Sequence, residues 1–204
     1  MSWGLAAATL ATLTVLSGVV WFERTRPDPR TIALIAAMAA LAVAGRIAFA
    51  PVAGVKPTTD IVLLAGFAFG ATPGFIVGCS TALISNVVFG QGLHTPWQML
   101  AWGGVGIFGA LIARALGGRP PNAASLALLC AIAALAFTLF MDVSVWVQTA
   151  PSHSLEEYLA ILAVGVPFLI AHMVGSAAFA LAFGRPMLAA LERAKRRASA
   201  RWEP

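Results

Sequence analysis

Long apolar segments, separated by short polar connections, make up nearly the whole chain. A membrane-spanning helix needs about 20 apolar residues, because the hydrocarbon core is about 30 Å thick and a helix rises 1.5 Å per residue. One segment, 58–70, would be only about 20 Å long, so we expect it to tilt or to be partly buried. The pattern predicts about seven helical segments: Trp3–Phe22, Thr31–Ala50, Thr58–Gly70, Phe75–Gly90, Trp97–Leu116, Ser125–Gln148 and Tyr158–Gly184.

Proline, glycine and polar residues mark the connections between these segments. The stretch 71–74, with Pro73 and Gly74, predicts a tight turn. Pro167 predicts a kink in the last segment, and the basic tail, 185–204, predicts a helix at the membrane surface. The other connections are expected to be loops: 23–30, 51–57, 91–96, 117–124 and 149–157.

Composition strengthens the membrane interpretation. Hydrophobic residues make up 60% of the 204 positions and charged residues only 10%, whereas a soluble domain carries about 25% charged residues. A net charge of +5 could suggest nucleic acid, but the basic residues lie in short runs between apolar segments. That distribution is typical of cytoplasmic loops. We therefore expect an all-α, polytopic membrane protein whose surroundings are the lipid bilayer, with no nucleic-acid partner.

The basic residues also predict an orientation. Cytoplasmic loops carry an excess of lysine and arginine. If the tail is cytoplasmic, loops 51–57, 91–96 and 149–157 face outward together, with Arg46 and Lys56 on their side. The basic residues that then fall inside are Arg24, Arg26, Arg30, Arg114, Arg119 and those of the tail.

The sequence holds no motif for common enzyme chemistry or for a metal. It lacks H-E-x-x-H, G-x-S-x-G and the P-loop. Cys79 and Cys130 lie inside apolar segments without C-x-x-C spacing, which indicates small buried side chains. The G-G-V-G-x-x-G stretch from Gly103 follows no strand and indicates closely packed helices rather than a dinucleotide site. We expect a protein that is not an enzyme and has no cofactor or metal.

Polar residues near the expected outer ends of the segments are the candidate ligand site. An ionisable group inside a membrane is costly and is usually paired or functional, and a buried amide needs a partner. Arg46 and Asp142 are expected to share a polar cavity, either as an ion pair or as ligand anchors. The candidate ligand-binding residues are Arg46, Lys56, Asp60, Asn86, Gln91, His94, Trp97, Gln98, Asp142 and Trp146.

Simpler roles stay open for several of these residues. Arg46 could extend to the interface as a snorkelling side chain, and Asp60 could pair with Lys56 or favour the start of its helix. Trp97 could belong to an interfacial aromatic belt. A single His94 is a weak metal ligand. His172, deep in the last segment, is expected to be a packed or hydrogen-bonded histidine.

From residue 31 to residue 184 the chain resembles the substrate-binding S component of energy-coupling factor (ECF) vitamin transporters. The resemblance rests on four stretches: A-L-I-A-A-M-A-A-L-A, R-I-A-F-A-P-V-A-G-V-K-P-T-T-D, A-G-F-A-F-G-A-T-P-G-F-x-x-G and S-N-V-V-F-G-Q-G-L-H-T-P-W-Q. It implies three parts: residues 1–30 as an extra transmembrane helix with a cytoplasmic loop, 31–184 as a six-helix membrane domain, and 185–204 as a basic cytoplasmic tail.

The resemblance also implies a function and partners. Such a subunit, in the plasma membrane of a prokaryote, captures a vitamin or related micronutrient from outside. It then docks on a transmembrane coupling subunit that carries two cytoplasmic ATPases. Small residues at A-x-x-x-A spacing on the first core helix serve docking in that family, and they let helix backbones approach closely. Here the corresponding residues are Ala33, Ala36, Ala37 and Ala40.

The ligand is less well defined than the class of function. The tryptophans and amide side chains suit a large ring with polar edges, so a cobalamin-like corrinoid is the first candidate. A flavin, a pterin or a modified-base precursor follows. Two other functions stay open: a membrane-embedded enzyme using His94 or His172 with Asp142, and a small membrane scaffold protein.

Overall fold

The protein is all-helical throughout the part that the structure describes. The computed structural model describes residues 3–199, without the side chains of residues 3, 4, 6, 7, 198 and 199, so the last five residues of the expected tail helix lie outside it. No strand occurs in residues 3–199. The helices are α1 (Trp3–Thr25), α2 (Pro29–Ala48), α3 (Thr58–Phe69), α4 (Ala71–Phe89), α5 (His94–Ala115), α6 (Ala123–Thr149) and α7 (Leu155–Phe179), followed by a π-helical turn, η1 (Ala180–Gly184), and α8 (Arg185–Ser199).

Five stretches of helix are long and apolar enough to cross a membrane, as expected of a multi-pass membrane protein. They are α2, α4, α5, α6 and the continuous run from α7 through η1 to α8. The short α3 does not reach spanning length, but all its residues from Thr58 to Phe67 are buried by its neighbours. This confirms the expected short, buried helix. The transmembrane role of α1 remains a prediction from its apolar sequence.

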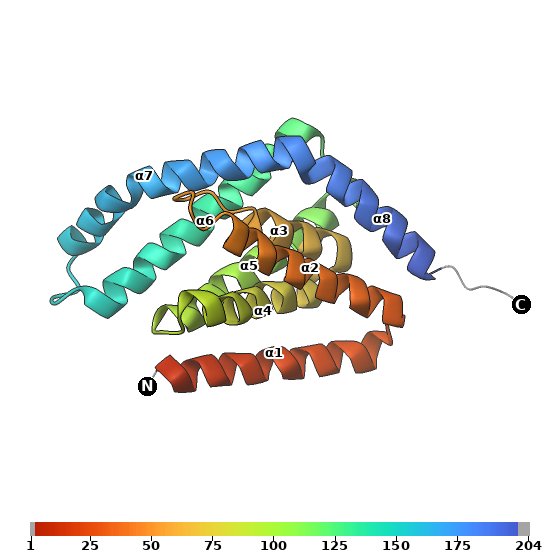
Figure 1. Ribbon diagram of the computed structural model, residues 1–204, viewed down its shortest axis with the longest axis horizontal. Coiled ribbons are helices and arrows are strands. Elements are labelled where there is room, and N and C mark those ends of the chain that lie inside the picture. Colours follow the sequence, from red (N-terminus) through yellow and green to blue (C-terminus); the bar gives the residue numbers. More distant parts are fainter. Residues whose placement is uncertain (1–2, 200–204) are drawn as a thin grey trace, which may run out of the picture.

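The helices form a bundle around α3. Figure 1 shows α1 along one side of the bundle and the α7–α8 run arching over the opposite side. α1 packs on α4 and α5, and α6 pairs with α7. α1 begins at one end of the molecule and α8 finishes at the other (Figure 1). α8 contacts the start of α2 and the end of α3. Arg30 Nη1 of α2 donates to the Arg197 carbonyl of α8, and Lys195 Nζ of α8 donates to the Ala68 carbonyl of α3.

Glycines bring α3, α4 and α5 into backbone contact. A methyl group added at Gly66 or at Gly74 would collide with backbone atoms of Gly106, and one at Gly109 would collide with the backbone of Leu63. Small residues permit this approach in a membrane, where packing rather than water exclusion holds helices together. The expectation that the glycine-rich stretch of α5 serves close helix packing is confirmed.

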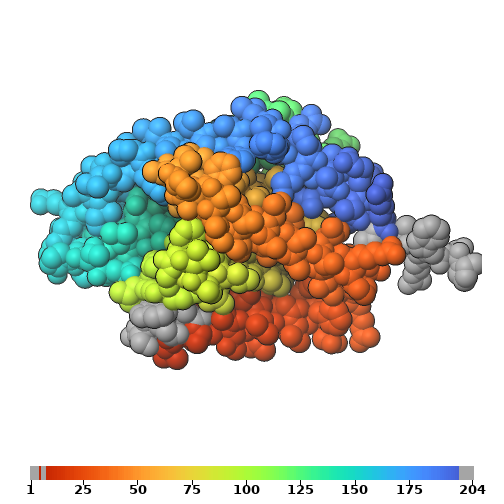
Figure 2. Space-filling view, viewed as in Figure 1, coloured from red at the N-terminus to blue at the C-terminus, as the bar shows by residue number. Residues whose placement is uncertain are grey.

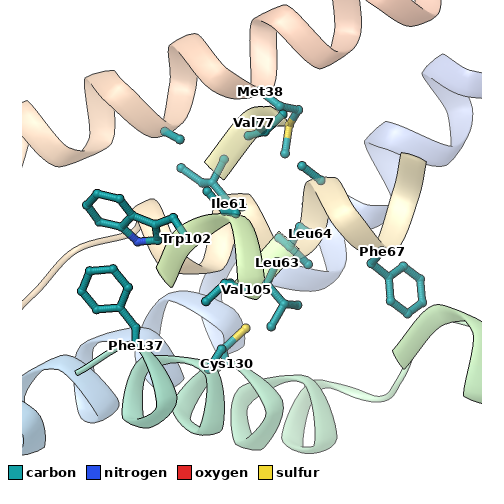
Figure 3. Packing of buried hydrophobic residues seen from close by; sticks show 14 of the residues in the cluster. Met38, Ile61, Leu63, Leu64, Phe67, Val77, Trp102, Val105, Cys130 and Phe137 are labelled. Atoms are coloured by element: carbon teal, nitrogen blue, oxygen red, sulfur yellow. The ribbon is translucent and has the colours of Figure 1, made fainter. Parts of the chain in front are cut away.

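Large side chains fill the remaining core around this contact. Figure 3 shows residues of α3, α4, α5 and α6 converging on it, with Met38 of α2 at its edge. The indole of Trp102 is fully buried and stacks on Phe137, with ring centroids 4.7 Å apart. Cys79 and Cys130 are buried free thiols, as expected. The packed core lies beside the polar residues of α2 and α4 and holds their helices in place.

The expected turn 71–74 and the second half of the expected loop 91–96 are instead the first turns of helices. Pro73 and Gly74 belong to α4, and the chain bends at Gly70, whose φ of +97° a glycine adopts without strain. The stretch 94–96 likewise begins α5, with Pro96 in its first turn. The reason is the same in both cases: the first N–H groups of a helix have no intrahelical partner, so proline is tolerated there.

The last predicted segment continues further than expected. α7 starts at Leu155 because Ser154 and Glu157 form a capping box. Pro167 lies inside α7 as predicted. Helix then runs through η1 directly into α8, so the basic tail is an extension of the last helix. A helix in the tail is confirmed as far as Ser199.

Candidate functional site

Arg46 is the centre of a polar cluster buried between α2, α4 and α5. It lies near the end of α2 and is only 7% exposed. Its Nη1 donates to the Ser85 hydroxyl at 2.5 Å and to Asn86 Oδ1 at 2.7 Å. Its Nη2 donates to Gln98 Oε1 at 3.4 Å. All three acceptors are neutral, so dipoles surround the guanidinium charge, and no carboxylate of the described residues neutralises it.

Asn86 connects Arg46 with the start of α5. Its Nδ2 donates to Thr95 Oγ1 at 3.0 Å and to Gln98 Oε1 at 2.9 Å, which uses both amide protons. Thr95 Oγ1 donates in turn to Gln91 Oε1 at 2.9 Å. Because Asn86 is fully buried and its amide protons are committed, its carbonyl oxygen is held toward Arg46. Four predicted site residues therefore form one network: Arg46, Asn86, Gln91 and Gln98.

Two aromatic rings lie close to the guanidinium. Its Cζ lies 4.7 Å from the ring centroid of Phe89 and 4.9 Å from that of Trp102. Ring faces attract a cation, more strongly where water is excluded. The three hydrogen bonds use three of the five guanidinium protons. The remaining donors, with the uncancelled charge, can bind an anion.

The expected ion pair between Arg46 and Asp142 is wrong. The ion pairs among the described residues join Arg26 to Glu23 and Arg196 to Glu192, all near the other end of the bundle or on the tail. Asp142 lies on α6 opposite α7, where its carboxylate oxygens are 3.5 Å from the position that a Cβ would take at Gly165. Asp142 therefore belongs to the α6–α7 hairpin and does not neutralise Arg46.

Lys56 adds a second positive charge near Arg46. Its Nζ lies 4.8 Å from the ring centroid of Phe168 on α7. Burial, together with the neighbouring charge of Arg46, lowers the pKa of Lys56 to about 8. The pair with Asp60 that the sequence allowed is not formed in the described structure. Two cations without a carboxylate partner thus lie on the same side of the core.

His172 belongs to a second, fully satisfied network, which meets the Arg46 cluster only at Trp102. Thr138 Oγ1 donates to the Ala134 carbonyl at 2.9 Å, so its oxygen accepts from His172 Nδ1 at 3.1 Å. Thr59 accepts from Trp102 Nε1 at 3.2 Å and donates to His172 Nε2 at 3.0 Å. This assignment gives every proton one acceptor and makes the imidazole neutral. The packed, hydrogen-bonded histidine expected from the sequence is what the structure contains.

The outer aromatic candidates are distributed over two places. Trp97 is half-buried and packs on Phe140 of α6, with ring centroids 5.5 Å apart. Trp146 lines a cavity of about 410 Å³ between α6 and α7, together with His153 and Tyr158. Its Nε1 donates to the Ser154 carbonyl. Trp146 is therefore not part of the Arg46 network, although the sequence grouped the two.

No hydrogen bond or ion pair joins His94 or His172 to Asp142, the residues of the enzyme alternative, in the described part of the chain. His94 lies in the first turn of α5, and its ring is 3.2 Å from the position that a Cβ would take at Gly92. His172 is committed to threonines. No cluster of three or more His, Cys, Asp or Glu side chains suited to a metal occurs in the described residues. The predicted site residues that converge in space are those around Arg46.

Sequence reasoning missed four members of this cluster: Ser85, Thr95, Phe89 and Trp102. Ser85 and Thr95 carry no strong signal, because a hydroxyl inside a helix can bond to a carbonyl one turn earlier, as Ser85 also does to Thr81. Phe89 and Trp102 read as ordinary apolar residues. Helical spacing offered some signal, since Ser85 and Phe89 are four residues apart and Asn86 is next to Ser85.

Comparison with known protein families gives a match, whereas two other comparisons give none. No curated protein and no solved structure matches the chain. A family described as of unknown function, DUF6580, matches residues 26–199, from the connection after α1 to the end of α8. That range includes every residue of the Arg46 network. The chain therefore belongs to the DUF6580 family.

Proposed function

We propose that this protein is a membrane-embedded binding subunit that captures a small organic anion. The observation that carries the proposal is Arg46, a 7% exposed cation held by three neutral acceptors and two ring faces, without a carboxylate partner among the described residues. An unpaired charge is costly in a membrane, and such residues commonly mark substrate pathways. A ligand carboxylate or phosphate would supply the missing negative charge.

The hydrogen bonds around Arg46 support an anion rather than a large neutral ring. The protons and the carbonyl oxygen of Asn86 are already committed, so it has little left for the polar edges of a corrinoid. The network instead fixes the guanidinium in position before a ligand arrives. Such preorganisation increases affinity, because binding then costs less side-chain entropy. The ligand class that fits is a vitamin or related micronutrient bearing a carboxylate or phosphate.

We further propose that the subunit works in the manner of an ECF S component. Its basic end, formed by residues 24–30, 114–119 and 193–197, would face the cytoplasm by the positive-inside rule. The Arg46 end would then face outward, toward the ligand. Ala33, Ala36, Ala37 and Ala40 are all exposed along α2. This strip of small residues could accept a transmembrane coupling subunit, whose two ATPases would supply energy.

Calorimetry with matched ligands tests the anion site. The probes are pantothenate and its alcohol, pantothenol, with other pairs of a carboxylate vitamin and its neutral analogue. Arg46→Gln is the test variant. Arg114→Gln is the matched control, because Arg114 is exposed at the other end of α5. The proposal expects the parent and the control to bind at least one carboxylate about tenfold more tightly than its neutral analogue, and Arg46→Gln to lose that preference. An equal loss in both variants, or no preference in the parent, would overturn it.

A further inference from the structure

Asp60, in the first turn of α3, is a second buried polar group. It lies next to a face of α2 other than the one that carries Arg46. Asp60 is 4% exposed, and neither of its carboxylate oxygens has a hydrogen-bond partner in the described part of the chain. The Cys130 thiol and the Ser176 hydroxyl are the polar neighbours of the carboxyl group, but within the described residues neither carboxyl oxygen, nor the buried Ser176 oxygen, has a partner at hydrogen-bonding distance and angle. Buried polar groups are almost always paired, so this one calls for a ligand.

Asp60 lines a cavity of about 420 Å³. Its walls are otherwise almost entirely apolar and include three phenylalanines: Phe49, Phe179 and Phe183. Their rings form a connected cluster, with centroids 5.0 Å apart for the first pair and 5.9 Å for the second. The volume lies within the range of small-molecule sites, which is roughly 300–1,000 Å³. The chemistry is that of an apolar chamber with a single acidic group.

The cavity is distinct from the Arg46 cluster because it uses another face of α2. Met38, Ala42 and Arg46, at spacing four, are buried toward α4. The cavity is lined by a different face of α2, whose residues also recur every four positions: Leu41, Gly45 and Phe49. The cavity opens between α2 and the α7–α8 run, where Leu41 is 48% and Phe183 is 61% exposed. In Figure 2 this is the region between the orange α2 and the blue η1 and α8.

The π-helical turn η1 forms the far wall of the cavity. Ala180, Phe183 and Gly184 all line it. π-turns are rare and are frequently found at functional sites. This turn lies where the α7–α8 run crosses the end of the cavity. The irregular backbone and the unpartnered Asp60 carboxylate therefore border the same cavity.

We propose that this cavity binds an apolar or aromatic primary amine. The ammonium group would meet the Asp60 carboxylate, which supplies the opposite charge, and would donate to both orphaned oxygens. The apolar part would lie among the three phenylalanines. The opening toward the apolar surroundings of the bundle gives such a molecule a lateral entry. This site is independent of the anion site and of the proposed uptake function.

Equilibrium dialysis of radiolabelled phenethylamine against the purified full-length protein tests the proposal. 2-Phenylethanol has the same ring and keeps a donor without the charge, and 3-phenylpropionate reverses the charge. We expect saturable binding of phenethylamine and at least tenfold weaker binding of the other two. Asp60→Asn should weaken phenethylamine binding at least tenfold, whereas Asp142→Asn, which alters an acid outside the cavity, should leave it unchanged.

A variant that leaves Asp60 in place guards against a folding defect. Leu41→Trp fills the opening from an exposed position, so it should also abolish phenethylamine binding. Retained binding in Asp60→Asn or in Leu41→Trp overturns the proposal, as does equal binding of 2-phenylethanol. If Asp60→Asn does not fold, Leu41→Trp decides alone. Binding of carboxylate vitamins at Arg46 should survive both substitutions, so failure of one site is distinguishable from failure of the other.

Discussion

Asn86 offers the sharpest test of the network that holds Arg46. Asn86→Ala removes the carbonyl that accepts from Arg46 at 2.7 Å and the amide that donates to Thr95 and Gln98. A hydrogen bond to a charged group contributes about 1.5–3 kcal/mol, and each of the two neutral ones about 0.5–1.5 kcal/mol. The sum is about 2.5–6 kcal/mol, and because such terms are not additive we expect a loss near the lower end, about 3 kcal/mol.

The companion variant Asn86→Asp separates the two roles of the residue. It keeps the acceptor for Arg46 and adds the negative charge that the site lacks. We therefore expect it to unfold at higher denaturant than Asn86→Ala, and to bind carboxylate ligands at least tenfold more weakly than the parent, because Arg46 then has an internal counter-ion.

Equilibrium titration with SDS in mixed micelles, followed by tryptophan fluorescence, measures the free energy of unfolding of the parent and of both variants. Calorimetry with a carboxylate vitamin then measures affinity. A free energy of unfolding of Asn86→Ala within about 0.5 kcal/mol of the parent's, the range of an ordinary surface substitution, would show that Asn86 does not hold Arg46 in place. Equal carboxylate binding by Asn86→Asp and the parent would show that Arg46 is not the anion site.

Four further substitutions, one of them a control, test other parts of the structure. His172→Ala leaves Thr59 and Thr138 without their imidazole partner, so it should lower the free energy of unfolding by about 2–4 kcal/mol while ligand affinity stays within twofold. Gly106→Ala forces a methyl group into the backbone of Gly74 and should destabilise by several kcal/mol. Gly104→Ala, whose methyl group would meet open space, should cost nothing, and equal stability of the two variants would disprove the close helix contact. Ala37→Trp should leave ligand binding intact but stop uptake in cells that hold the coupling partners, and normal uptake would exclude this face as the docking surface.

The general fold was predictable from the sequence because the constraint on membrane helices is strong. About 20 apolar residues are needed to span, and the interruptions between Ala48 and Thr58 or between Phe89 and His94 are clear. Helix starts were less predictable. Pro73 and Pro96 looked like loop residues but occupy first turns, where proline loses no hydrogen bond. The start of α7 was readable from the S-L-E-E capping sequence at Ser154 and was missed.

The candidate site was predictable only in part, for a related physical reason. Arg46, Asn86 and Gln98 could be grouped because polar groups in an apolar segment need partners and these lie near the same ends of their helices. Which partner each one finds depends on helix rotation and packing, which the apolar pattern does not specify. Asp142 was therefore assigned to Arg46, although it faces Gly165 on α7. Asp60 was likewise grouped with Arg46 from the sequence, but in the structure it lies on α3 and lines a cavity that does not include Arg46.

The most direct test of the central claim is native mass spectrometry of the parent protein and of Arg46→Gln, purified side by side from cells in a mild detergent. If Arg46 holds the ligand, the parent retains a small molecule bearing a carboxylate or phosphate, identifiable after release, and Arg46→Gln is recovered folded but without it. The same adduct on both proteins would rule out Arg46 as the anion site, because binding would then not depend on the buried guanidinium.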